Sequence, residues 1–210
     1  MNELHQSIPP LIFGTSETAK QAVIMLHGRG SSPEDILGLS THLAIPDTVF
    51  IAPRAKNNTW YPQRFIRPVS ENEPWLTSAL ETVSQAIQQT NLPLEKIVLL
   101  GFSQGACLAL EYAARHGGRF GGVIAFSGGL IGSDTEVGKL AKPLLETPVF
   151  IGCDEADFHI DLARVQQSSK ILTSLGANVD TRIYKGLGHS INMDEIIAAQ
   201  SIRGNVKLTT

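Results

Sequence analysis

The chain has 210 residues, of which 42% are hydrophobic and 18% charged, and its formal net charge at pH 7 is −3. A chain of this length and hydrophobic content can bury a substantial core, so we expect one globular domain, residues 1–210. The lack of a positive excess argues against nucleic acid as a partner and against electrostatic docking on anionic membranes.

Short apolar, β-branched segments alternate along the chain with segments that favour helices. In chain order we predict a strand at 22–26, a helix at 33–42, strands at 48–52 and 96–102 with a helix at 73–90 between them, a helix at 104–116, strands at 122–126 and 148–152, a helix at 162–175, a strand at 180–184 and a helix from about 193. This alternation predicts an α/β fold with a mainly parallel sheet and helices on both faces. Ser32 before Pro33 is a predicted N-cap, and Gly176 after Leu175 a predicted helix stop.

The segment 54–72 is the exception to this alternation. It contains Trp60, Tyr61 and Phe65 but shows neither helical nor strand periodicity. A long irregular insertion with aromatic residues is often a binding loop or lid, so we expect this segment either to line a substrate pocket or to cover the core. Trp60, Phe65 and Trp75 are our candidates for apolar walls of a pocket, with core or lid packing as the alternative for each.

No segment of the sequence indicates export or membrane insertion. The first residues lack the basic and long apolar regions of a secretory signal, and no window approaches the ~18 apolar residues of a membrane span. We therefore expect a cytoplasmic protein without integral membrane association. Cys107 and Cys153 have neither C-x-x-C nor metal-ligand spacing, so we expect two reduced core cysteines and no bound metal.

The most informative motif is Gly-Phe-Ser-Gln-Gly at 101–105, which follows an apolar strand and precedes a helix. In this context the G-x-S-x-G motif holds its serine, Ser103, in a strained turn that leaves the hydroxyl exposed above the sheet. Serine alone is a poor nucleophile, so the motif also requires a base and an orienting carboxylate, which follow it in the order acid, then histidine.

Both partners occur in that order. His189 lies in the glycine-rich loop 186–190, directly after the last predicted strand, which places it at the same edge of the sheet as Ser103. The other histidines lie in the amino-terminal tail, at helix ends or beside the acidic loop. Three carboxylates compete for the acid position after strand 148–152, namely Asp154, Glu155 and Asp157, and spacing alone does not choose among them.

Attack on a carbonyl also requires donors for the developing oxyanion. We expect one donor to be the backbone N–H of Gln104, at the amino end of its helix, where the helix dipole favours negative charge. The second should come from the loop after strand 22–26, which reads His-Gly-Arg-Gly at 27–30. We assign it to the backbone N–H of Arg29, with Gly28 as the competing choice. A tight strand-to-helix turn is the alternative interpretation of this loop.

These motifs resemble the phospholipase/carboxylesterase group of α/β-hydrolases, which includes small bacterial carboxylesterases and acyl-protein thioesterases. The likeness spans most of the chain and rests on Leu-His-Gly-x-Gly at 26–30, Ala-Pro-Arg at 52–54 followed by Trp60, the serine motif at 101–105, Phe-Ser-Gly at 126–128 and Gly-x-Gly-His at 186–189. The resemblance implies an α/β-hydrolase fold without a large cap domain. It also identifies Asp157 as the acid, because segment 158–165 aligns without a gap with the segment after the family's catalytic aspartate.

Two departures from the family pattern fall near the acyl site. Arg29 stands where many relatives carry leucine, and Phe158, His159 and Asp161 replace a Pro-Val…Pro pattern. The stretch 57–62 also differs from the corresponding loop of the thioesterases.

Together, the sequence predicts a serine carboxylesterase with Ser103, Asp157 and His189 as its catalytic residues. It would act through an acyl-enzyme on small or medium acyl esters, without a cofactor. The alternatives within enzymes are a lysophospholipase or an acyl-thioesterase, and a peptidase is disfavoured because the chain has no room for a large cap domain. The alternative outside enzymes is a binding protein on a hydrolase fold that has lost turnover. We expect a small-molecule ester or thioester as the partner, and a homodimer is compatible with the sequence although no feature requires one.

Overall fold

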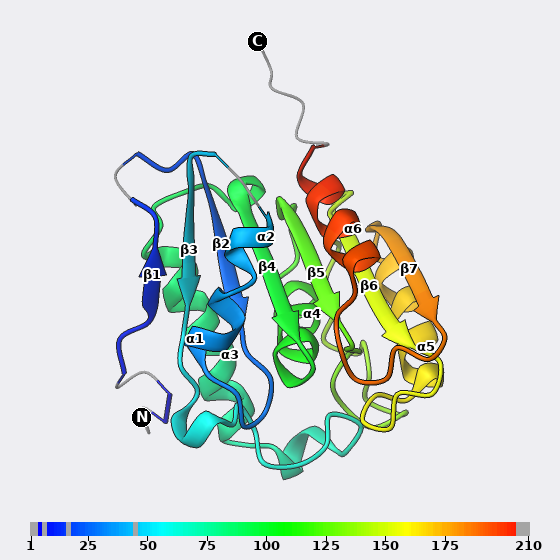
Figure 1. Cartoon of the computed structure of the whole chain (residues 1–210). Helices are drawn as coiled ribbons and strands as arrows, with labels where there is room; N and C mark the ends of the chain where they lie inside the picture. Colours follow the sequence, from blue (N-terminus) through cyan, green and yellow to red (C-terminus); the bar gives the residue numbers. More distant parts are fainter. Residues whose placement is uncertain (1–3, 6–7, 16–17, 44–45, 205–210) are drawn as a thin grey trace.

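The centre of the computed structural model, which describes residues 4–5, 8–15, 18–43 and 46–204, is a seven-stranded sheet (Figure 1). In sheet order its strands are β1 (Leu11–Phe13), β3 (Thr48–Ala52), β2 (Gln21–Leu26), β4 (Ile97–Phe102), β5 (Gly122–Phe126), β6 (Pro148–Asp154) and β7 (Asn178–Tyr184). Every neighbouring pair is parallel except β1 with β3. The predicted mainly parallel sheet is confirmed, and the carboxyl ends of its parallel strands share one edge, at the bottom of Figure 1.

Helices cover both faces of this sheet. α1 (Pro33–Leu37), α2 (Ser40–Leu43) and α6 (Met193–Gly204) lie in front in Figure 1, and α3 (Trp75–Gln88), α4 (Gln104–His116) and α5 (Leu162–Ser174) lie behind. Side chains of β2 alternate between the two resulting cores. Ala22, Ile24 and Leu26 join the core behind the sheet, whereas Val23 and Met25 join the core in front. A strand covered on both faces is therefore apolar throughout, which is what made it recognisable in the sequence.

Both predicted helix limits are confirmed by hydrogen bonds. The Ser32 hydroxyl accepts from the backbone N–H of Asp35, and the Asp35 carboxylate accepts from the N–H of Ser32, which forms a capping box at the start of α1. After α5, Gly176 has a φ of 87°, and its N–H donates to the carbonyl of Thr173. The N–H of Ala177 donates to Leu172, which completes a Schellman motif.

The structure differs from the prediction in two elements. The predicted helix 33–42 is interrupted at Gly38, after which α2 begins at Ser40, and glycine has a low helix propensity. The strand β1 was not predicted. It has only three residues, and Ile12 and Phe13 are about half exposed at the sheet edge, so it has no long apolar pattern.

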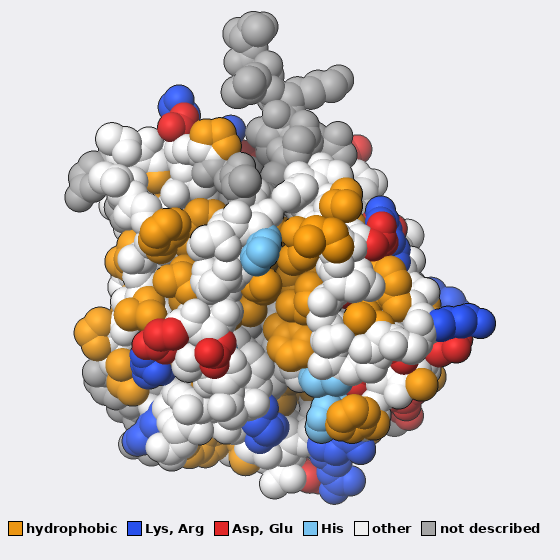
Figure 2. Space-filling view, viewed as in Figure 1, with side chains coloured by type: hydrophobic (Ala, Val, Ile, Leu, Met, Phe, Trp, Pro, Cys, Tyr) orange, Lys and Arg blue, Asp and Glu red, His pale blue; other side chains and the backbone are white. Residues whose placement is uncertain are grey.

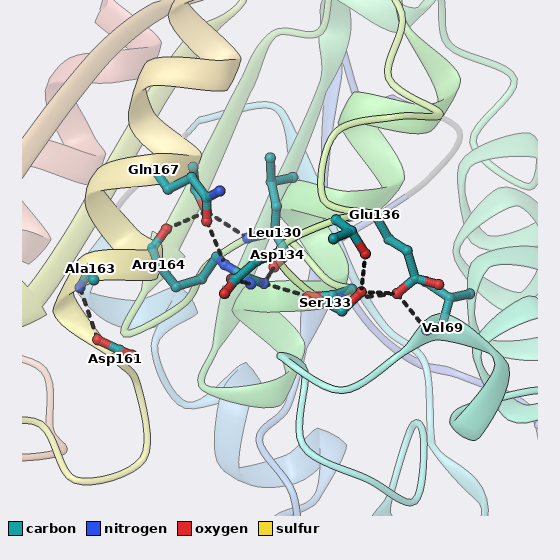
Figure 3. Close-up of polar contacts among 12 residues, drawn as sticks. Val69, Leu130, Ser133, Asp134, Glu136, Asp161, Ala163, Arg164 and Gln167 are labelled. Atoms are coloured by element: carbon teal, nitrogen blue, oxygen red, sulfur yellow. Dashed lines mark hydrogen bonds and ion pairs between the residues drawn. The ribbon is translucent and has the colours of Figure 1, made fainter.

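Two irregular connections follow the carboxyl ends of β3 and β5 and are tied together there. The side chain of Arg164, from α5, is buried and donates to the carbonyl of Leu130 and to the carboxylate of Asp134 (Figure 3). The carboxylate of Glu136 accepts from the backbone N–H of Val69, which belongs to the 54–72 segment. These contacts hold the 54–72 segment in place beside the edge of the sheet where the predicted site residues lie.

Candidate active site

Ser103 lies in the sharp turn between β4 and α4, with a φ of 55° and a ψ of −117°. A positive φ is costly for a residue with a Cβ atom, so its surroundings must fix this conformation. The N–H of Ser103 donates to the carbonyl of Phe126 on β5, and its carbonyl accepts from the N–H of Cys107 in α4. The turn is therefore held from both the sheet and the helix.

The two glycines of the serine motif allow strand and helix to approach this closely. A Cβ atom added to Gly101 would lie 2.3 Å from the backbone of Gly105. One added to Gly105 would lie 2.0 Å from the carbonyl oxygen of Leu26. Neither position can hold a side chain without moving backbone, which is the physical reason for the small residues in the motif.

Ser103, Asp157 and His189 follow three different strands, and hydrogen bonds connect their side chains in series. His189, in the loop between β7 and α6, has its Nε2 atom 2.9 Å from the Oγ atom of Ser103. Its Nδ1 atom lies 2.7 Å from the Oδ2 atom of Asp157, in the loop after β6. With the proton on Nδ1, the imidazole donates to the carboxylate and accepts from the serine hydroxyl. In this arrangement His189 can take the proton of Ser103.

The carboxylate of Asp157 is completely buried, while the side chain of His189 is 14% exposed. The second oxygen of Asp157, Oδ1, accepts from the backbone N–H groups of His159 at 2.8 Å and Ile160 at 3.1 Å. These bonds compensate the burial of the carboxylate and fix its orientation toward the imidazole.

The other two candidate acids point elsewhere. Asp154 accepts from the backbone N–H of Ala156 and, at 2.7 Å, from that of Leu187, so it anchors the loop that carries His189. The hydrogen bonds from these backbone groups, that of Ala156 first, lower the pKa of Asp154. The carboxylate of Glu155 lies 3.8 Å from Lys185 near the surface. Of the three, Asp157 is the one in contact with His189.

The two predicted oxyanion donors flank Ser103. Gln104 is the first residue of α4, where backbone N–H groups have no acceptor within the helix. On the other side, a Cβ atom on Gly28 would lie 3.5 Å from the Cβ atom of Ser103, so the loop after β2 packs directly on the serine turn. Gly28 and Arg29 both border the cavity in front of Ser103.

The side chain of Gln104 joins the serine turn to the 54–72 segment. Its Oε1 accepts from the backbone N–H of Trp60 at 2.9 Å, and its Nε2 donates to the carbonyl of Tyr61 at 2.8 Å. The indole N–H of Trp60 in turn donates to the carbonyl of His27, in the loop after β2. Three segments that are distant in sequence are therefore locked together around Ser103.

A cavity of about 300 Å³ opens in front of Ser103. Its walls come from the loop after β2, the 54–72 segment, the serine turn and the loops after β6 and β7: Gly28, Arg29, Ser31, Tyr61, Arg64, Phe65, Phe102, Gln104, Cys107, His159, Ile160 and His189. At the lower right of Figure 2, histidine side chains adjoin those of Lys or Arg on the surface at this edge of the sheet.

The aromatic residues predicted for the pocket have different positions. Phe65 lies in the cavity wall, as expected. Trp60 and Trp75 do not border it, contrary to our prediction. Trp60 is fully buried between His27 and His5, and Trp75 packs on the ring of His5 with 5.5 Å between ring centres. Trp60 therefore anchors the 54–72 segment to the core, and Trp75, the first residue of α3, packs on His5 outside the cavity.

Several residues of the cavity wall were not predicted, among them Tyr61, Arg64, His159 and Ile160. Cys107 could have been found, because it lies in the first turn of α4, four residues after Ser103, the N-cap of that helix. Burial raises the pKa of the Cys107 thiol to about 12, so this thiol is neutral at physiological pH. Cys107 and Cys153 are both buried and free, as the sequence predicted.

Within residues 4–5, 8–15, 18–43 and 46–204, which the structure describes, no group of three or more His, Cys, Asp or Glu side chains is arranged to hold a metal ion. No helix in the same ranges combines the length and apolar character needed to cross a membrane.

Comparisons with known proteins agree on one group. A family model described as phospholipase/carboxylesterase matches residues 10–203. Acyl-protein thioesterase 1 of Debaryomyces hansenii is 26% identical over 97% of this chain and 99% of its own. A probable carboxylesterase of Oryza sativa subsp. japonica is 24% identical over 95% of this chain and 83% of its own. The crystal structure of a phospholipase/carboxylesterase from Dyadobacter fermentans is 41% identical with a TM-score of 0.89, and the match covers 93% of this chain and 95% of that one.

Proposed function

Since the chain belongs to the phospholipase/carboxylesterase family of α/β-hydrolases, we propose that it is a serine carboxylic-ester hydrolase with Ser103 as nucleophile, His189 as general base and Asp157 as orienting acid. The observation that carries this proposal is the chain of hydrogen bonds that runs from the Oγ atom of Ser103 through His189 to Asp157. We further propose that residues 1–210 form a single domain, and that the partner is a small-molecule ester.

The first half of the proposed reaction forms an acyl-enzyme. The Oγ atom of Ser103 attacks the ester carbonyl carbon while its proton passes to Nε2 of His189. Asp157 stabilises the imidazolium that forms, and the backbone N–H groups of Gln104 and Arg29 hold the negative charge on the carbonyl oxygen. His189 then protonates the leaving oxygen, and the alcohol departs.

The second half releases the acid. A water molecule enters the place of the alcohol, gives a proton to Nε2 of His189 and attacks the acyl carbon. The same donors hold the second oxyanion, and its collapse returns the proton from His189 to Ser103. No step requires a redox change or a metal ion.

A thioesterase is the second candidate, and the similarity to acyl-protein thioesterase 1 over nearly the full length of both chains favours it. The chemistry of attack is the same, because thiolate replaces alkoxide as the leaving group. The difference between the two activities lies in the leaving group that the cavity accepts. A lysophospholipase would use the same residues on a lipid ester.

The test is hydrolysis of p-nitrophenyl esters from acetate to palmitate, with butyryl and palmitoyl thioesters of coenzyme A measured alongside. We expect turnover by the wild-type protein that is lost in Ser103→Ala, with a chain-length optimum that separates a short-acyl esterase from a lipid-directed enzyme. A higher kcat/KM on the thioesters would favour the thioesterase. Absence of turnover on every substrate would favour a binding protein that lacks catalytic activity.

A further inference from the structure

The cavity in front of Ser103 carries positive charge without a matching carboxylate. Arg29, from the loop after β2, and Arg64, from the 54–72 segment, both border it. The residues that line the cavity in the described part of the chain include no aspartate or glutamate. This local excess opposes the net charge of the protein, which is −3, so it is not a consequence of overall composition.

The described arginine side chains outside the cavity are neutralised by carboxylates. Among the arginines whose side chains the structure describes, those outside the cavity each pair with a carboxylate: Arg54, Arg67, Arg115, Arg119, Arg164 and Arg182. Arg29 and Arg64 are the exceptions within that set. A guanidinium group that lines a binding cavity without an acidic partner is available to an anionic ligand.

The contacts of the Arg29 and Arg64 side chains leave some of their N–H donors unused. Arg29 donates to the backbone carbonyls of Pro62 at 3.0 Å and Gln63 at 2.8 Å. Arg64 makes one long contact, 3.4 Å, with the carbonyl of His159. A guanidinium group has five N–H donors, so these bonds to neutral oxygens use only some of them. The guanidinium of Arg29 also lies over the ring of Tyr61, with its Cζ atom 6.0 Å from the ring centre, but this contact brings no negatively charged group to it.

The position of Arg64 assigns the charge to one side of the reaction centre. Arg64 contacts the backbone of His159, whose ring lies 4.6 Å from the ring of His189 between centres. In the proposed reaction His189 delivers a proton to the leaving oxygen, so the leaving group occupies the side of the cavity that His189 borders. Arg29 reaches toward the same rim, because its guanidinium binds the two residues that precede Arg64.

On the basis of the proposed hydrolase function, we infer that Arg29 and Arg64 bind an anionic group on the leaving-group side, a carboxylate or a phosphate. The substrate class is then an ester or thioester of an alcohol or thiol that bears an acidic group. Hydrolysis breaks the acyl carbon–oxygen or carbon–sulfur bond, adds water, and releases a carboxylic acid together with the anionic alcohol or thiol. The planar fork of an arginine matches both carboxylate and phosphate oxygens.

The test compares matched aryl acetates that differ in leaving-group charge: 4-acetoxybenzoate, the neutral 4-acetoxybenzamide, and 4-acetoxyphenyl phosphate. The readout is the ratio of kcat/KM for each anionic ester to that for the amide. We expect this ratio to fall about tenfold or more in Arg64→Gln, the size expected for the loss of a hydrogen bond to a charged group, and to be partly restored in Arg64→Lys. Arg67→Gln is the matched control, since Arg67 lies in the same segment, pairs with Glu71 and does not border the cavity.

A second measurement is independent of turnover. Calorimetric binding of the free products, 4-hydroxybenzoate and 4-hydroxybenzamide, should show tighter binding of the anion, lost in Arg64→Gln and weakened by salt. Hydrolysis of the neutral ester with no change of the ratio in Arg64→Gln would overturn the inference and leave the proposed function standing. A charge preference confined to the acyl side, measured with mono-4-nitrophenyl succinate against 4-nitrophenyl butyrate, would also overturn it. Absence of turnover by the wild-type protein on every ester would instead refute the proposed function.

Discussion

The carboxyl group of Glu195, in the first turn of α6, is fully buried against Gly152 of β6. Its Oε2 atom accepts from the backbone N–H of Asn192 at 2.9 Å, but its Oε1 atom has no hydrogen-bond partner among the described residues. Burial is the main reason that the pKa of this carboxyl is raised from 4.5 to about 7. The neutral form of Glu195 is therefore the one that the folded protein favours.

We predict that Glu195→Gln removes a pH-dependent loss of stability. The folded wild-type protein keeps this proton up to about pH 7, whereas the unfolded chain loses it near pH 4.5. The wild-type free energy of unfolding should therefore fall as pH rises between these values, by ~1.4 kcal/mol per pH unit and by about 3 kcal/mol in all. Below the lower value both states hold the proton, and the contribution vanishes. Glutamine resembles the protonated carboxyl and does not titrate.

Urea unfolding followed by tryptophan fluorescence at pH 5, 6, 7 and 8 measures this difference. The free energy of unfolding of Glu195→Gln minus that of the wild type should increase steadily from pH 5 to pH 7 and then level off. Glu155→Gln is the control, because this carboxylate in the loop after β6 is more exposed. Its free energy of unfolding minus that of the wild type should not change with pH. A difference between Glu195→Gln and wild type that is constant with pH would refute the reasoning.

The other predictions concern the serine turn and the acid loop. Gly105→Ala should lower the free energy of unfolding by ~3 kcal/mol or more, because its Cβ atom would meet a backbone carbonyl at 2.0 Å; a fully stable variant in urea unfolding would contradict this. Gln104→Leu should cost ~1–3 kcal/mol, because the buried N–H of Trp60 loses its acceptor. It should also raise KM more than it lowers kcat, since the backbone donor stays; an unchanged unfolding curve would argue against this anchoring role. Asp157→Asn should lower kcat by ~10⁴-fold, the loss typical of an imidazole held in the wrong tautomer. Asp154→Asn should lower kcat less than about tenfold, because this substitution only loosens the loop that carries His189. The reverse order in steady-state kinetics would assign the acid to Asp154.

The parts of this site that follow from local backbone constraints could be predicted from the sequence. The turn at Ser103 was predictable from Gly101 and Gly105, because only glycine allows β4 and α4 to approach so closely. His189 was predictable from its place after the last strand, since parallel strands end at one edge of the sheet.

Other parts depend on how segments pack, which no local pattern encodes. Spacing did not distinguish Asp157 from Asp154, and the difference lies in which carboxylate faces His189. Aromatic content in the 54–72 segment drew attention to Trp60, but this residue faces the core rather than the cavity. Arg64 was missed because a single charged residue in an irregular loop has no periodicity that would show which way it points.

The most direct test of the central claim is mass spectrometry of the intact protein and its peptides after reaction with a fluorophosphonate probe. We predict one adduct per chain, on Ser103, that does not form in Ser103→Ala and forms much more slowly in His189→Ala. An adduct on a different residue, or no adduct on a folded protein, would contradict the assignment of Ser103 as an activated nucleophile.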